Sequence, residues 1–106
     1  LTAQSTFGKE GTGLGEFGRF AGLLPYPGPI GLAIKDNYLF VADTGNSRIQ
    51  LLKINPDGSL TAQSTFGKEG TGLGEFREPF ALAIKDNYLF VADTGNNRVQ
   101  ILEIKY

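Results

Sequence analysis

The stretch LAIKDNYLFVADTGN occupies residues 32–46 and recurs letter for letter at residues 82–96. A second identical stretch, LTAQSTFGKEGTGLGEF, occupies residues 1–17 and 60–76. The 106-residue chain is therefore a repeat of two units. A repeat unit cannot bury its own apolar faces and must stack on neighbouring units, and a stable stack normally needs three or more. We therefore expect the function of this chain to depend on what completes the stack.

An insertion distinguishes the first copy from the second. Residues 18–28 (GRFAGLLPYPG) stand where the second copy has only Arg77 and Glu78. Prolines stiffen this loop, and its apolar side chains make it a candidate binding loop, namely Phe20, Leu23, Leu24 and Tyr26. Such a loop either packs against its own chain or a second subunit, or it binds an external partner.

One full repeat contains four short segments with the composition of β-strands. In the first copy they span residues 30–35, 38–42, 48–54 and 60–66. These segments are rich in β-branched and aromatic residues and show no helical period. The turn sequences KDN, DTGN and NPDG separate them, and DTGN contains residue types that accept the positive φ of a tight hairpin. The pattern predicts an all-β fold of antiparallel strands.

Four antiparallel strands that grade from apolar to polar are typical of one β-propeller blade, with the first strand at the central axis. A blade that lies between two others must be apolar on both faces. The third strand meets this condition, with Ile49 and Leu51 on one face and Leu52 and Ile54 on the other. Residues 1–106 are thus predicted to form a single unit of two blades.

The phase of the repeat leaves some strands without partners. Residues 29–67 hold a complete blade, residues 79–106 hold a blade without its outer strand, and residues 1–8 hold an outer strand without a blade. We expect this orphan strand to complete the unfinished blade of a second chain, which would remove an exposed sheet edge and close a head-to-tail ring of four, six or eight blades. The residues expected at this contact are Leu1, Ala3, Phe7, Val99, Ile101 and Ile104.

Two recurring motifs resemble the NHL repeat of β-propellers. Residues 41–50 and 91–100 are similar to its signature, and the glycine-rich segments 7–17 and 66–76 resemble its connection between blades. The chain departs from the family in the middle of the name-giving triplet, where Ser47 and Asn97 replace a frequent His. The resemblance covers nearly all of the chain outside the insertion and indicates a two-blade fragment or an engineered repeat protein.

The resemblance also implies an assembly and a class of function. NHL propellers usually close with six blades, which favours a trimer of this chain. Family members act mostly as interaction platforms, while some bind RNA with a basic face and a few relatives are enzymes with His at a metal site. This chain has no His, and its 10 basic residues are scattered among 11 acidic ones. We therefore expect neither enzyme activity nor a nucleic-acid partner.

The composition excludes several kinds of site. Without Cys or His, the chain can form neither a disulfide nor a metal site with thiolate or imidazole ligands, and we expect no cofactor and no metal. No apolar run approaches the roughly 18 residues of a membrane span, and no signal-peptide pattern opens the sequence. We expect a soluble protein without a membrane partner, in a compartment that the sequence does not identify.

Two polar motifs allow a ligand-binding and a structural interpretation. Asp43 with Arg48, and Asp93 with Arg98, lie across a tight turn from each other. They form either a polar ligand site or structural turn pairs, in which the Asp accepts turn N–H groups and the Arg bridges to a nearby carboxylate or carbonyl. We favour the structural interpretation. The glycine-rich segment at 8–15 is not followed by a helix, as a phosphate cradle would require, and we interpret it as a connection between blades.

Two functions from different classes follow from these observations. The first is a non-catalytic, self-assembling β-propeller module that forms a closed homotrimeric ring by strand exchange between chains. The near-identity of the copies indicates either a recent duplication or deliberate engineering. The alternative is a domain that binds a peptide, protein or small molecule through the loop at 18–28.

Overall fold

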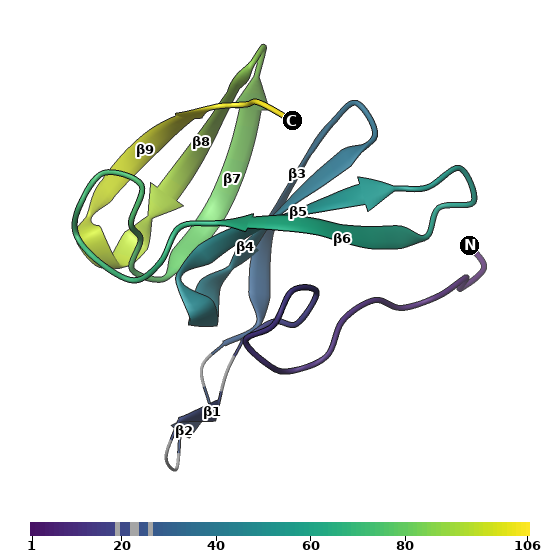
Figure 1. Cartoon of the computed structure of the whole chain (residues 1–106), viewed down its shortest axis with the longest axis horizontal. Coiled ribbons are helices and arrows are strands. Elements are labelled where there is room, and N and C mark those ends of the chain that lie inside the picture. Colours follow the sequence, from purple (N-terminus) through teal and green to yellow (C-terminus); the bar gives the residue numbers. More distant parts are fainter. Residues whose placement is uncertain (19, 22–23, 26) are drawn as a thin grey trace.

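The computed structural model describes residues 1–18, 20–21, 24–25 and 27–106, which form two antiparallel sheets and a short hairpin (Figure 1). The two 3-10 turns of the described part span three residues each. In this part of the chain, no helix has the length and apolar character needed to cross a membrane. The all-β prediction is confirmed.

The first sheet, called blade 1 here, contains the four strands predicted for the first copy. They are β3 (Pro29–Lys35), β4 (Tyr38–Asp43), β5 (Arg48–Ile54) and β6 (Leu60–Phe66). Each strand pairs antiparallel with the next, in the order β3-β4-β5-β6. A two-residue turn joins β3 to β4, and Asp36 in it adopts the left-handed φ of 54° that favours Asp or Asn.

The second sheet, called blade 2, repeats this arrangement up to its third strand. It contains β7 (Pro79–Lys85), β8 (Tyr88–Asp93) and β9 (Arg98–Glu103), paired antiparallel in that order. No described segment pairs with the outer edge of β9. The edge therefore presents free backbone N–H and C=O groups, as the phase of the repeat predicts.

The turn after the second strand of each blade differs in detail from the expected hairpin. Residues Thr44–Asn46 (η1) and Thr94–Asn96 (η2) form 3-10 turns. The left-handed residue is the next one, Ser47 with φ 51° and Asn97 with φ 53°. The backbone N–H of Ser47 donates to the carbonyl of Thr44 at 3.2 Å, and a 3-10 turn of this kind ends in one left-handed residue before the strand resumes.

A glycine-rich loop precedes each blade. Residues 8–18 lead toward β3 and residues 67–77 lead toward β7, and each loop is closed by a parallel bridge, Glu10 with Phe17 or Glu69 with Phe76. The Phe17 ring lies where Gly8 would carry a side chain, and the φ of 104° at Gly8 also requires glycine. The loop is therefore folded by its own glycines and one aromatic ring.

The main core lies between the two blades. Phe40, Ala42 and Ile49 of blade 1 pack against Leu89, Val91 and Ile104 of blade 2, together with Phe76. The inner strands β3 and β7 lie side by side (Figure 1), and a Cβ on Gly31 would overlap the carbonyl oxygen of Phe80. A second cluster of Phe17, Val41 and Leu52 lies on the opposite face of blade 1.

The insertion carries a feature that the sequence did not predict. Strands β1 (Phe20–Ala21) and β2 (Leu24–Pro25) pair antiparallel as a two-stranded hairpin. This hairpin projects away from both sheets (Figure 1). Of the four candidate binding residues, Phe20 and Leu24 lie on these strands, whereas Leu23 and Tyr26 lie outside the described residues.

Candidate functional site

Four polar side chains at the end of β4 and the start of β5 form one network, called the clip here: Asp43, Asn46, Arg48 and Gln50. The Arg48 Nε donates to the Asp43 Oδ2 at 2.7 Å. The side-chain amides of Asn46 and Gln50 donate to the same oxygen at 3.0 and 3.2 Å. The other carboxylate oxygen accepts the N–H of Gly18 at 2.9 Å. Asp43 is fully buried, so these donors replace the water it loses.

The clip holds the glycine-rich loop 8–18 against blade 1. The Arg48 guanidinium donates to the carbonyl oxygens of Thr12, Gly13 and Glu16 at 2.8, 2.9 and 3.0 Å. Gln50 donates to the Glu16 carbonyl at 2.6 Å and accepts the N–H of Gly15 at 3.0 Å. The Asp carboxylate thus accepts a backbone N–H from the incoming loop and not, as was expected, from the turn. The Arg bridges to carbonyl groups, as expected, and these belong to the same loop.

Blade 2 has an equivalent clip of Asp93, Asn96, Arg98 and Gln100. Arg98 donates to Asp93 at 2.8 Å, and the N–H of Arg77 donates to its second oxygen at 2.8 Å. Burial raises the pKa of Asp93, but hydrogen bonds from Arg77, Asn96, Arg98 and Gln100 lower it by more, so the pKa lies below its ordinary value. The carboxylate therefore stays ionised although it is buried.

In each glycine-rich loop, one of the acidic side chains bonds back to the loop itself. Glu16 accepts the N–H of Gly13 at 2.9 Å and pairs with Lys9 at 3.3 Å. The hydrogen bond from Gly13, followed by the one from Lys9, holds the pKa of Glu16 below its ordinary value. Glu75 repeats these contacts with Gly72 and Lys68. Within the described ranges, no three acidic side chains gather to hold a metal ion.

Hydrogen bonds join the two blades at the ends of their strands. The Thr44 hydroxyl donates to the carbonyl of Pro79 at 2.6 Å, and the N–H of Glu78 donates to the Ser47 hydroxyl at 3.3 Å. Thr44 is fully buried, whereas its equivalent Thr94 lies exposed on blade 2. The contact between the blades is therefore both apolar and polar. Thr94 of blade 2 is in the position to make the same contact as Thr44, but no further blade among the described residues faces it.

The chain presents two open apolar faces that correspond to the two halves of this contact. The leading face, on β3 of blade 1, consists of Ile30, Leu32 and Ile34, and the last two are 61% and 63% exposed. Their equivalents in blade 2, Leu82 and Ile84, pack half-buried against the core between the blades. The leading face thus has the residues that make a contact between blades, but no blade packs against it in the part of the chain that the structure describes.

The trailing face, on β9 of blade 2, consists of Val99 and Ile101, which are 64% and 60% exposed. Their equivalents in blade 1 are Ile49, only 3% exposed, and the half-buried Leu51. The same positions are therefore covered once within the chain and open once at its end. Both residues were expected at a contact between chains.

The other residues predicted at that contact lie in different places. Residues 1–7 are exposed and join no sheet, so Leu1 and Ala3 are open to solvent. The Phe7 ring lies edge-on to Phe17 with centroids 6.4 Å apart. Ile104 is only 6% exposed and packs in the core between the two blades of its own chain. The side chain of Ile104 therefore belongs to the existing contact rather than to an open face.

Two features of the site were not predicted from the sequence: Gln50 and Gln100 complete the clips, and Thr44 bonds across the blades. Gly31 was expected to supply a small residue where backbones crowd near the axis, and it lies against the backbone of Phe80. The two copies differ at the last of these positions, because Ala81 is the equivalent of Gly31. Comparing the copies position by position would have singled out this substitution, although not the contact that makes it matter.

Comparison with known families supports a propeller-type repeat. The LVIVD repeat, a repeat of β-propeller type, matches residues 30–48 and 80–102. The two matches begin at equivalent residues of β3 and β7, so the similarity follows the two blades. Comparison with curated proteins found no match.

Proposed function

We propose that this chain is a non-catalytic, self-assembling β-propeller module whose copies stack head to tail into a closed ring. Three copies would supply six blades, the number that the resemblance to NHL propellers favours. We further propose that the repeat is of the NHL type, and that it arose by a recent duplication or by engineering. The ring itself would be the functional object, as a platform for protein contacts.

The observation that carries the proposal is the correspondence between buried and open positions. Within the chain, the Ile49 side of blade 1 covers the Leu82 and Ile84 side of blade 2. At the ends of the chain, the equivalent Val99 side and the equivalent Leu32 and Ile34 side are both open. A second copy can therefore repeat the internal contact with its leading face on the trailing face of the first.

Physical considerations favour closure over an open chain of copies. Covering exposed Leu, Ile and Val side chains stabilises by about 25 cal/mol per Å² of apolar surface removed from water. A head-to-tail contact is heterologous, so copies continue to add until a rotation closes the ring. A closed ring leaves no trailing face open, which an open stack cannot achieve.

Charge placed on the trailing face tests this proposal. Ile101→Glu puts a carboxylate into the contact between copies, so we expect a folded chain that sediments as a monomer. Lys53→Glu, on an exposed side chain of blade 1, serves as a matched control and should leave the oligomer intact. An unchanged oligomer of the Ile101→Glu chain would contradict the proposed contact, whereas circular dichroism of both variants verifies that the strands are formed.

Recognition of a peptide or small molecule by the loop at 18–28 stays a prediction. Its hairpin projects from the sheets, but two of its four candidate residues lie outside the described part. Replacing both Phe20 and Leu24 with Ser tests it, because loss of a bound partner without loss of the ring would assign recognition to the loop.

A further inference from the structure

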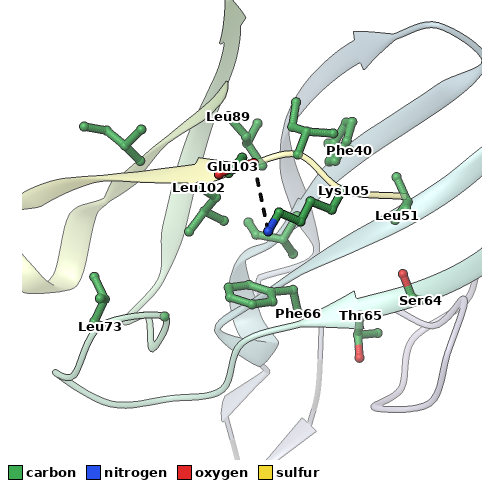
Figure 2. A pocket seen from close by; sticks show the side chains of 14 residues that line it. Phe40, Leu51, Ser64, Thr65, Phe66, Leu73, Leu89, Leu102, Glu103 and Lys105 are labelled. Atoms are coloured by element: carbon green, nitrogen blue, oxygen red, sulfur yellow. Dashed lines mark ion pairs between the residues drawn. The ribbon is translucent and has the colours of Figure 1, made fainter. Parts of the chain in front are cut away.

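A groove of about 530 Å³ lies between the outer strand of blade 1 and the unpaired edge of blade 2 (Figure 2). Phe66 and Thr65 of β6 border it on one side, and Leu102 and Glu103 of β9 border it on the other. Leu89, Leu73 and Gly74 also line it. The groove is thus mainly apolar, and one of its walls is a strand edge with free backbone groups.

In blade 1, the space equivalent to this groove is filled by the outer strand β6. There, Leu60 and Ala62 of β6 pack against the cluster of Val41, Leu52 and Phe17. Leu52 is only 1% exposed as a result. Its equivalent Leu102 is half-buried and lines the groove. Blade 2 therefore has the binding surface for an outer strand, and no segment of the described residues occupies it.

We propose that this groove and the free edge of β9 form a specific binding site for a β-strand, namely residues 1–7 of a second copy. The inference deepens the proposed ring assembly and rests on it. Residues 1–7 have the same sequence as β6, LTAQSTF, and carry no charged side chain that an apolar groove would have to desolvate. Residues 1–7 of another copy therefore have the same sequence as the strand that fills the equivalent site in blade 1.

The pairing within blade 1 fixes the register of the bound strand. There, Leu60 lies opposite Ile54, Ala62 opposite Leu52 and Phe66 opposite Ile49, with an irregularity between Leu51 and Leu52. Transferred to blade 2, Leu1 lies opposite Ile104, Ala3 opposite Leu102 and Phe7 opposite Val99. A shift of one residue would turn Leu1 and Ala3 away from the groove, so the apolar pattern resists slippage.

A second copy, rather than the same chain, supplies the strand. Phe7 is held beside Phe17 at the leading side of blade 1, and residues 1–7 run from there away from β9 (Figure 1). The connection 67–77 has the same geometry one blade later, with Phe66 edge-on to Phe76 at 6.2 Å. Because β6 reaches back from that loop into blade 1, residues 1–7 reach back toward the blade that precedes their own.

The groove is selective for a small residue at the third position. In blade 1, a Cβ built on Gly15 would lie 3.4 Å from the Cβ of Ala62, so the glycine-rich loop and the outer strand are in close contact there. Gly74 occupies the equivalent place in the groove, and its φ of 81° also requires glycine. A side chain larger than Ala3 would strike the backbone of this loop.

Cysteine pairs test the register, and the chain offers a clean background because it has no native Cys. The pair Thr2→Cys and Glu103→Cys should give disulfide-linked multimers on oxidation. The pair Lys53→Cys and Thr61→Cys joins equivalent positions within blade 1 and provides the matched control for geometry, with an intrachain bond and no change of mass. The pair Ser5→Cys and Glu103→Cys is out of register and should stay unlinked.

A second substitution in the in-register cysteine pair tests the selectivity for a small third residue. Ala3→Leu should lower the yield of the disulfide between positions 2 and 103 about tenfold, whereas Gln4→Leu should not.

The mass of the unmodified chain separates this inference from the proposed function. Linked multimers from the in-register pair alone would support the strand site. An unlinked oligomer, with the blade 1 control pair linked, would overturn the strand site and leave ring assembly standing. An unlinked monomer would overturn both. Equal linkage of the in-register and out-of-register pairs would overturn the register.

Discussion

The contact between the two blades and the two open faces at the ends of the chain are built from nearly the same residues. Inside the chain, Ile49 is 3% exposed and Thr44 bonds to the carbonyl of Pro79. At the end, the equivalent Val99 is 64% exposed and Thr94 also lies open. The difference shows that the exposure of these side chains is set by the neighbouring blade rather than by the strand on which they lie. A blade of this type is therefore half of an interface on each side.

The proposed contact between copies would differ from the contact within the chain, however. Gly31 lies against the backbone of Phe80, and its equivalent in blade 2 is Ala81, which carries a Cβ. A copy stacked on blade 2 would bring Ile30 to the place of Phe80, so its inner strand must lie farther from Ala81 than β3 lies from β7. The contact between copies is thus expected to be wider near the axis and weaker than the one within the chain.

The largest expected effect concerns the clip that holds the link between blades. Asp93→Ala leaves Arg98 and Gln100 without their shared acceptor and frees the Arg77 N–H. We expect a loss of about 3–5 kcal/mol in the free energy of unfolding, because several hydrogen bonds to a fully buried carboxylate are lost together. Urea unfolding measures it. A loss below about 1 kcal/mol would contradict the role given to the clip.

The next prediction compares equivalent positions in the closed and open contacts. Ile49→Ala should cost about 2–5 kcal/mol, because it leaves a cavity in the core. Val99→Ala should change the unfolding free energy of the dilute chain by no more than about 0.5 kcal/mol, since its side chain is exposed. Equal losses at a concentration where the chain is monomeric would refute the distinction between the two contacts.

A third prediction addresses the spacing at the axis. Gly31→Ala should destabilise the chain by about 1–3 kcal/mol, because the new Cβ forces β3 away from β7. The reverse exchange, Ala81→Gly, should tighten the contact between copies and lower the concentration at which the oligomer dissociates. Thermal unfolding measures the first variant and a dilution series the second. A harmless Gly31→Ala would show that β3 and β7 are not closely packed.

The smallest expected effect is a dependence on pH. The folded-state pKa of Asp93 lies below its unfolded value of about 3.9, so the unfolded chain binds more protons in acid. The stability that this carboxylate contributes is present above about pH 4 and is lost as the pH falls through the folded pKa. The difference in unfolding free energy between the native chain and Asp93→Asn should therefore shrink below pH 4. A constant difference would contradict the cause given for the pKa.

Much of the fold could be predicted from sequence because the relevant signals are local. The strands from Tyr38 to Ile54 were placed within a residue or two by their β-branched and aromatic residues and by the turns between them. The clip was only half predicted, because the partners of Arg48 are carbonyl groups some 32 to 36 residues away in a glycine-rich loop. Every residue has a backbone carbonyl group, so the sequence does not indicate which of them accept these hydrogen bonds. The unpaired edge of β9 was predicted from the phase of the repeat, whereas the groove beside it was not, since its lining comes from both blades.

The mass of the 106-residue chain in solution tests the central claim most directly. Light scattering at micromolar concentration should give about 34 kDa, three times the 11.4 kDa of one chain. A mass two or four times that of the chain would keep head-to-tail closure but change the number of blades. A folded monomer of 11.4 kDa throughout the micromolar range would contradict the claim that the open faces bind each other.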